Sequence, residues 1–191
     1  MLRRLHRLRA LTRRLSRDRR GATAIEFALI SVPMLILFLG LIELGMILLV
    51  SVTLETATEF TARDIRTGVF QLSGSSTRDD YKGKVCRNMS WLSGLCQTNL
   101  YVEAETFATF AGAGGSTPAA TERVDPDAAC WSVGNPEDIV LVRTYFKWPI
   151  VTPLLKPLLM TASDGSRLLS TAKVFRNEPF NPAQRPGGAR C

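Results

Sequence analysis

The sequence is poor in histidine, and acidic residues are nearly missing from its N-terminus. His6 is the single histidine among 191 residues, so nothing after it can supply the imidazole of a Ser-His-Asp or Cys-His catalytic group, or a histidine metal ligand. Residues 1–21 hold nine arginines and one acid, Asp18, and therefore carry +8, whereas the whole chain carries +7. Residues 22–191 thus sum to −1. The basic segment also lacks an aromatic residue that could stack on a base, which argues against nucleic-acid binding.

Charge is also missing from Phe27 to Ile42, which read FALISVPMLILFLGLI. A hydrocarbon core of about 30 Å needs roughly 20 helical residues, so a helix that starts at Ala22 reaches the far side of a bilayer near Ile42. The arginines on its N-terminal side predict that residues 1–21 stay in the cytoplasm and that the rest is translocated. A cleaved secretory signal would have a shorter apolar core and a small-residue cleavage site.

The junction between the basic segment and the apolar helix is distinctive. The basic segment ends at Gly21, the helix begins at Ala22, and Glu26 follows five residues after the glycine. This arrangement resembles the processing site of type IV pilin-like proteins, in which a membrane-bound prepilin peptidase cuts after the glycine. The resemblance implies that Gly21 ends the leader and that Ala22 is the mature N-terminus.

Glu26 is a candidate assembly residue because a carboxylate in the apolar leaflet costs several kcal/mol unless it finds a partner. Cleavage after Gly21 would create a positively charged amine on Ala22. In a helix bundle, Glu26 could pair with this amine of its own chain or with that of a neighbour. The alternative is an interfacial Glu26 whose side chain extends to the headgroups.

Helical periodicity continues beyond the membrane segment. We predict one helix from Ala22 to about Thr67, which ends at Gly68. Its outer half presents an apolar stripe formed by Leu54, Ala57, Ala62 and Ile65 with Phe60. A polar loop over residues 73–80, a short helix over about 79–92 and a loop over residues 111–129 are expected further along.

Three later segments alternate in the manner of strands: Leu100–Phe107, Ile139–Phe146 and, more weakly, Leu168–Phe175. Antiparallel strands bury one face only if another element covers them, and the amphipathic half of the long helix is available. We therefore predict an α+β fold in which a long N-terminal transmembrane helix continues as the spine of a small domain with a three- or four-stranded antiparallel sheet. The predicted segments are a leader (1–21), a transmembrane helix (22–52), an extracytoplasmic helix (53–72), an α+β domain (73–180) and a tail (181–191).

The four cysteines, Cys86, Cys96, Cys130 and Cys191, all follow the membrane segment. An oxidising compartment would permit disulfides, and four cysteines allow three pairings. We prefer Cys86 with Cys96 because they are close in sequence, which leaves Cys130 with Cys191. A structural zinc site is disfavoured because the spacings lack a C-x-x-C pair, and we expect no metal or cofactor.

Residues 21–45, GATAIEFALISVPMLILFLGLIELG, carry a more specific resemblance. Their E-F-A-L run, which includes Phe27, and their G-x-x-E-x-G ending at Gly40, Glu43 and Gly45 are similar to TadE-like proteins, the minor pseudopilins of the tight-adherence (Flp-type) pilus. Several downstream features also look like that family: Ala62-Arg63 with Arg66-Thr67-Gly68, the Cys86 and Cys96 pair, the segment 142–153 and the segment 175–180. Glu43 is either an exposed carboxylate near the outer interface or a helix contact to another subunit.

The resemblance implies a non-enzymatic protein of the bacterial inner membrane with a periplasmic C-terminal domain, which can pass into the pilus after processing. Its role would be the assembly or initiation of a type IVb pilus. Its implied partners are the prepilin peptidase, a second minor pseudopilin, the major pilin, the inner-membrane assembly platform and membrane lipid, with no nucleic acid. The alternative is a single-pass anchored periplasmic envelope protein or enzyme unrelated to pili.

Overall fold

The computed structural model describes residues 21–74, 76–116 and 130–181. The chain divides into two compact units, Met1–Ile42 and Glu43–Cys191. Helix α2 (Ala22–Arg66) supplies the described helical part of the first unit and continues into the second, which confirms the predicted long helix. Residues 43–52, the last part of the predicted transmembrane helix, belong to the second unit.

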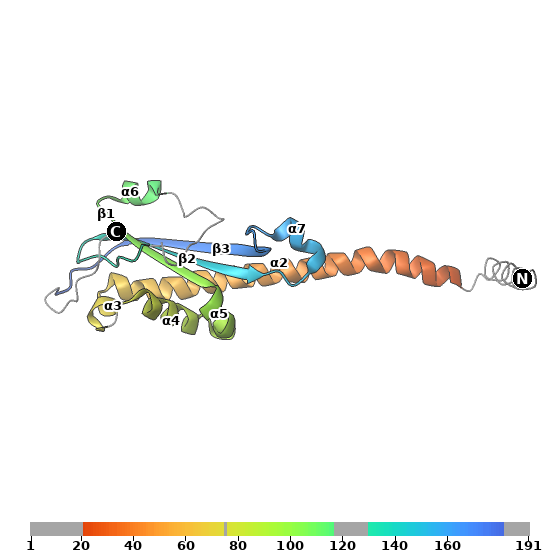
Figure 1. Cartoon of the computed structure of the whole chain (residues 1–191), viewed down its shortest axis with the longest axis horizontal. Coiled ribbons are helices and arrows are strands. Elements are labelled where there is room, and N and C mark those ends of the chain that lie inside the picture. Colours follow the sequence, from red (N-terminus) through yellow and green to blue (C-terminus); the bar gives the residue numbers. More distant parts are fainter. Residues whose placement is uncertain (1–20, 75, 117–129, 182–191) are drawn as a thin grey trace, which may run out of the picture. The chain divides into compact units, whose positions relative to one another are not determined.

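The second unit contains a three-stranded antiparallel sheet with the order β1-β2-β3. Its strands are β1 (Leu100–Phe107), β2 (Ile139–Pro149) and β3 (Ser166–Arg176). In the register, Ala104 lies opposite Val142, and Val142 lies opposite Lys173. Figure 1 shows the strands lying along the C-terminal half of α2. The predicted α+β class and antiparallel sheet are confirmed.

The main core forms between α2 and one face of the sheet. Val50, Leu54 and Ile65 are buried there together with Val142 and Phe146 of β2. Successive residues of β2 point alternately to this face and to the opposite face of the sheet, as the pleat of a strand requires. The predicted helix stripe is correct except at Phe60, which is 63% exposed. Thr61 takes the inward position instead, because adjacent residues lie about 100° apart around a helix.

Short helices follow the end of α2. Gly68 adopts φ 77°, and a Cβ on it would lie 2.5 Å from the Phe180 ring, so both conformation and space favour glycine. The elements after it are α3 (Val69–Leu72), α4 (Arg78–Asn88), η2 (Ser90–Leu92) and α5 (Ser93–Asn99). The single helix predicted over about 79–92 is therefore wrong in its extent. It starts one residue earlier, behind a capping box between Thr77 and Asp80, and is divided after Asn88.

The predicted loop over residues 111–129 is also wrong at its start. Helix α6 (Phe110–Gly115) occupies it, because the Thr109 side chain accepts a hydrogen bond from the Gly112 N–H and caps the helix. Ala113 of α6 packs with Ile139 and Leu141 on the face of the sheet that α2 does not cover. The rest of that loop, residues 117–129, lies outside the described residues.

The hairpin between β2 and β3 contains two more short helices. These are η3 (Pro153–Leu155) and α7 (Lys156–Leu159). Neither is expected from the sequence pattern, because each is a single turn.

Candidate helix anchor and carboxylate site

The predicted processing junction lies at the beginning of α2. Gly21 immediately precedes Ala22, the first residue of the helix, and both residues are exposed. A Cβ built on Gly21 would meet no atom within 4 Å. Among the described residues, therefore, no neighbour requires a glycine at this position.

Glu26 and Phe27 lie one turn into α2 and are both exposed, Phe27 by 74%. Nearly every apolar residue from Ile25 to Ile42 is exposed as well. By length and composition, α2 is the one helix among the described residues that could cross a membrane. Within the first unit, an apolar surface of this kind is typical of a helix that is solvated by lipid or packed among other helices.

Glu43 lies in a different environment, because its side chain is only 4% exposed. Its carboxylate accepts hydrogen bonds on both oxygens from the end of β2 and the residues that follow. Oε1 accepts from the Trp148 Nε1–H at 3.4 Å and from the Val151 N–H at 3.2 Å. Oε2 accepts from the Thr152 N–H at 3.1 Å and from the Thr152 hydroxyl at 3.0 Å.

These contacts show what Glu43 does within its own chain. A buried carboxylate is costly unless hydrogen bonds replace its lost water, and four donors replace it here. The site joins α2 to the hairpin between β2 and β3, which begins more than 100 residues later in the sequence. Sequence reasoning missed Trp148, Val151 and Thr152 as partners, because no local pattern reports a pairing over such a distance.

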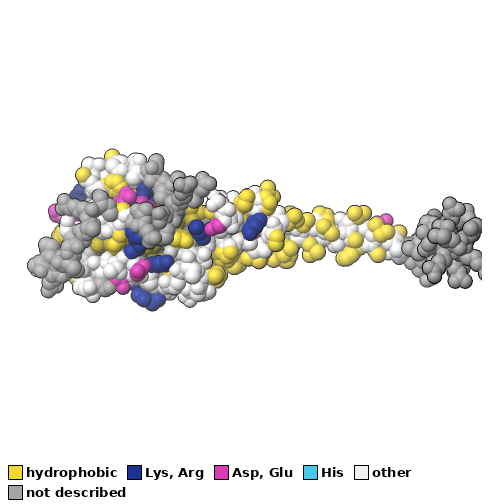
Figure 2. All heavy atoms as spheres, in the orientation of Figure 1, with side chains coloured by type: hydrophobic (Ala, Val, Ile, Leu, Met, Phe, Trp, Pro, Cys, Tyr) yellow, Lys and Arg dark blue, Asp and Glu magenta, His cyan; other side chains and the backbone are white. Residues whose placement is uncertain are grey.

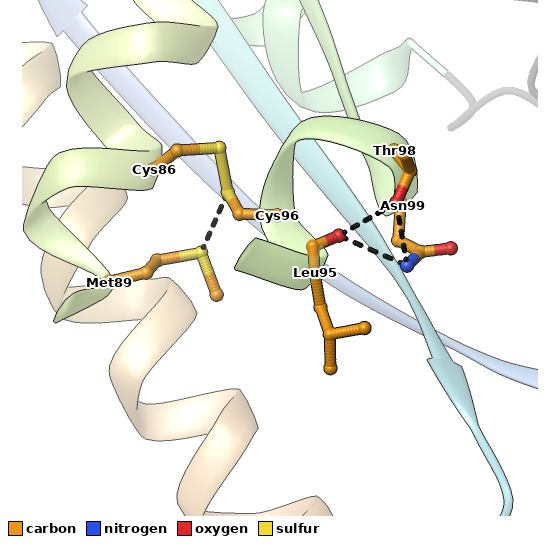
Figure 3. The surroundings of a disulfide bond; sticks show 6 residues. All are labelled: Cys86, Met89, Leu95, Cys96, Thr98 and Asn99. Carbon is orange, nitrogen blue, oxygen red and sulfur yellow. Dashed lines mark hydrogen bonds between the residues drawn. A yellow bond between two sulfur atoms is a disulfide. The ribbon is translucent and has the colours of Figure 1, made fainter. Parts of the chain in front are cut away.

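The predicted disulfide between Cys86 and Cys96 is confirmed. It joins α4 to α5 with a Cα–Cα distance of 5.5 Å, as Figure 3 shows. The Met89 sulfur lies 3.5 Å from that of Cys96; this is a packing contact, since a disulfide sulfur has no proton to donate. Closing a loop of this length stabilises a protein by about 3 kcal/mol in the chain-entropy description. Cys130 is also disulfide-bonded, and Cys191 lies outside the described residues.

A second polar cluster lies on the face of the sheet beneath α6. Arg143 Nη1 is 2.9 Å from Glu103 Oε1, and both side chains are less than a tenth exposed. Arg143 also donates to the Ser116 carbonyl at 3.0 Å. Burial and the neighbouring Glu103 charge raise the pKa of Glu105. The hydrogen bond to Ser116 holds the end of α6 against the sheet, and the ion pair joins β1 to β2. No local sequence pattern predicts this cluster.

A groove runs between α2 and the outer edge of β3. Glu59, Phe60, Lys173 and Val174 are among its lining residues. Lys173 bridges the two elements, because its ammonium lies 3.1 Å from Glu55 and 3.0 Å from Glu59. The hydrogen bond to Glu59 is the main reason that the pKa of Lys173 is raised. Among the described residues, no group of three or more His, Cys, Asp or Glu could hold a metal ion.

The protein belongs to the structural class in which an apolar N-terminal helix continues into a small α+β domain. Within that class, the family model described as TadE-like protein matches residues 21–63. This match confirms the resemblance to TadE-like proteins over the helix, and it indicates the setting of a tight-adherence pilus system. It does not reach the downstream segments. The comparisons with curated proteins and with solved structures each found no match.

Proposed function

We propose that the protein is a minor pseudopilin that takes part in the assembly or initiation of a tight-adherence type IVb pilus. The observation that carries the proposal is the TadE-like match over residues 21–63, which starts at the predicted junction glycine. The exposed apolar helix behind that junction suits a single-pass anchor. The role proposed for the chain is structural rather than catalytic.

The proposal includes processing and orientation. A prepilin peptidase removes residues 1–21, whose arginines first hold the N-terminus in the cytoplasm. Residues 22–191 then remain in the inner membrane, with the α+β domain in the periplasm. The partners would be a second minor pseudopilin, the major pilin and the assembly platform.

N-terminal sequencing of the membrane-extracted protein tests this proposal. In cells that contain the peptidase, we expect the chain to start at Ala22, and Gly21→Val should leave it starting at Met1. Gly45→Val is a matched control, because a Cβ at Gly45, as at Gly21, meets no atom within 4 Å. Unprocessed wild-type protein, or equal processing of Gly21→Val, would refute the proposed function.

A further inference from the structure

The hairpin between β2 and β3 exposes an unusual amount of apolar surface. Its segment 151–160 reads VTPLLKPLLM. Val151 is 73% exposed, Leu154 61%, Leu158 79% and Met160 49%. A run of large apolar side chains left in water is unfavourable, and such surfaces mark contacts with a partner or a membrane.

This segment is fixed to α2 at Glu43. The carboxylate of Glu43 accepts hydrogen bonds from the backbone N–H groups of Val151 and Thr152. Leu159, at the end of α7, packs against the main core, as does Met46 of α2. The apolar segment is therefore held beside a defined turn of α2.

That turn is where a membrane span of α2 would end. The 21 residues from Ala22 to Ile42 rise about 31 Å in a helix, close to the roughly 30 Å thickness of a hydrocarbon core. Glu43 comes next, and Leu44 and Leu48 behind it are 51% and 66% exposed. The second unit thus carries apolar surface on both α2 and the hairpin at the residues that follow the span.

The charges of the hairpin are compatible with a lipid headgroup region, because its one acid, Asp164, is paired with Lys147. Lys156 is the one charged residue between Val151 and Ala162, and it lies next to Gly165 at the other end of the hairpin. Arg167 donates to the Leu159 carbonyl at 3.2 Å. Figure 2 shows basic and hydrophobic side chains together in the region of α7. Long basic side chains can extend to lipid phosphates while neighbouring apolar groups enter the acyl boundary.

We propose that segment 151–160 inserts into the headgroup and acyl boundary of the membrane that α2 spans. The domain would then be held at the membrane both by α2 and by segment 151–160. The hydrogen bonds of Glu43 would fix that segment to α2. This inference rests on the membrane anchoring included in the proposed function. Lipid explains both the position beside the end of the span and the composition of segment 151–160, which has one basic residue and no acidic residue.

Quenching by brominated lipids tests the contact in the full chain, reconstituted into phosphatidylcholine and phosphatidylglycerol vesicles. Leu158→Trp places a probe on α7, and its high exposure allows the larger side chain. Phe110→Trp is the matched control, because Phe110 is 53% exposed in α6 on the other face of the sheet. Phe38→Trp reports on the anchor itself. Each variant is compared with the parent chain, which has three tryptophans.

We expect the added fluorescence of Leu158→Trp to be quenched about twofold more than that of Phe110→Trp, because interfacial segments bury their apolar face by roughly 5–10 Å. Quenching of Phe38→Trp without that of Leu158→Trp would overturn the inference and leave the anchor intact. Quenching of neither would overturn both. A blue shift of Leu158→Trp that grows with protein density, without bromine quenching, would show that a second copy covers the segment and would also overturn the inference.

Discussion

Glu43 lies between an apolar helix segment on its N-terminal side and a polar site within the domain. It directly follows an uncharged run of sixteen residues, where an unpaired carboxylate would be costly. Its four hydrogen bonds shield the charge on the side that faces the hairpin. The sequence alone predicts either an exposed carboxylate or a contact with another subunit. The structure places the carboxylate in an internal site.

Removal of that carboxylate should destabilise the domain. Glu43→Ala leaves the buried Trp148 indole N–H and the part-buried N–H groups of Val151 and Thr152 without an acceptor, so we expect a loss of about 2–4 kcal/mol in the free energy of unfolding. Glu43→Gln keeps one acceptor oxygen and should lose less. Urea unfolding in detergent, followed by tryptophan fluorescence, measures both.

Glu55→Ala provides the control for this measurement. Glu55 lies on the same helix with an exposed side chain, and its partner Lys173 keeps Glu59. Its loss should cost less than about 1 kcal/mol. Equal stability of Glu43→Ala and Glu55→Ala would contradict a structural role for the Glu43 site.

Elements with a long periodic pattern were predictable, and those set by a single turn or a distant contact were not. The 45 residues of α2 and the alternation in β1 and β2 can be read from the sequence, because apolar residues recur at the helical or strand period over many positions. In contrast, α6 depends on one cap at Thr109 within a glycine-rich stretch. The partners of Glu43 depend on how β2 ends against α2, which only the tertiary fold decides.

The contact between α2 and the edge strand β3 predicts a pH dependence. The pKa of Lys173 is raised above 10.5, mainly by its hydrogen bond to Glu59. A raised pKa means that the stabilisation is fully present below pH 10.5 and is lost as the pH rises through the folded-state pKa. Lys173→Met should therefore lower stability by less than about 1 kcal/mol at neutral pH, since the pair is partly solvated.

Urea titrations of the wild type and of Lys173→Met at a series of pH values check this prediction. The difference between the two chains should shrink as the pH passes above 10.5. A difference that stays constant over that range would mean that Lys173 acts through the packing of its aliphatic stem rather than through its charge.

At the scale of the whole molecule, the precursor and its proposed product differ in net charge. The net charge of +7 includes +8 from residues 1–21, so the processed chain carries −1. Under the proposed function, the basic leader sets the orientation and is then discarded. The charged groups that remain in the first unit after cleavage are Glu26 and the new amine of Ala22, within a surface that is otherwise uncharged.

That pair leads to a prediction about assembly. Glu26 is exposed among the described residues, so Glu26→Ala and Glu26→Gln should fold and be cleaved almost normally. If the carboxylate pairs with an Ala22 amine among packed helices, both variants should enter the pilus assembly poorly, because the amine would be left in lipid without a counter-charge. The measurement is the amount of cleaved protein that co-purifies with the assembled pilus machinery. Glu55→Gln, on the same helix, should assemble normally, whereas normal assembly of Glu26→Gln would rule out charge pairing and favour the interfacial alternative.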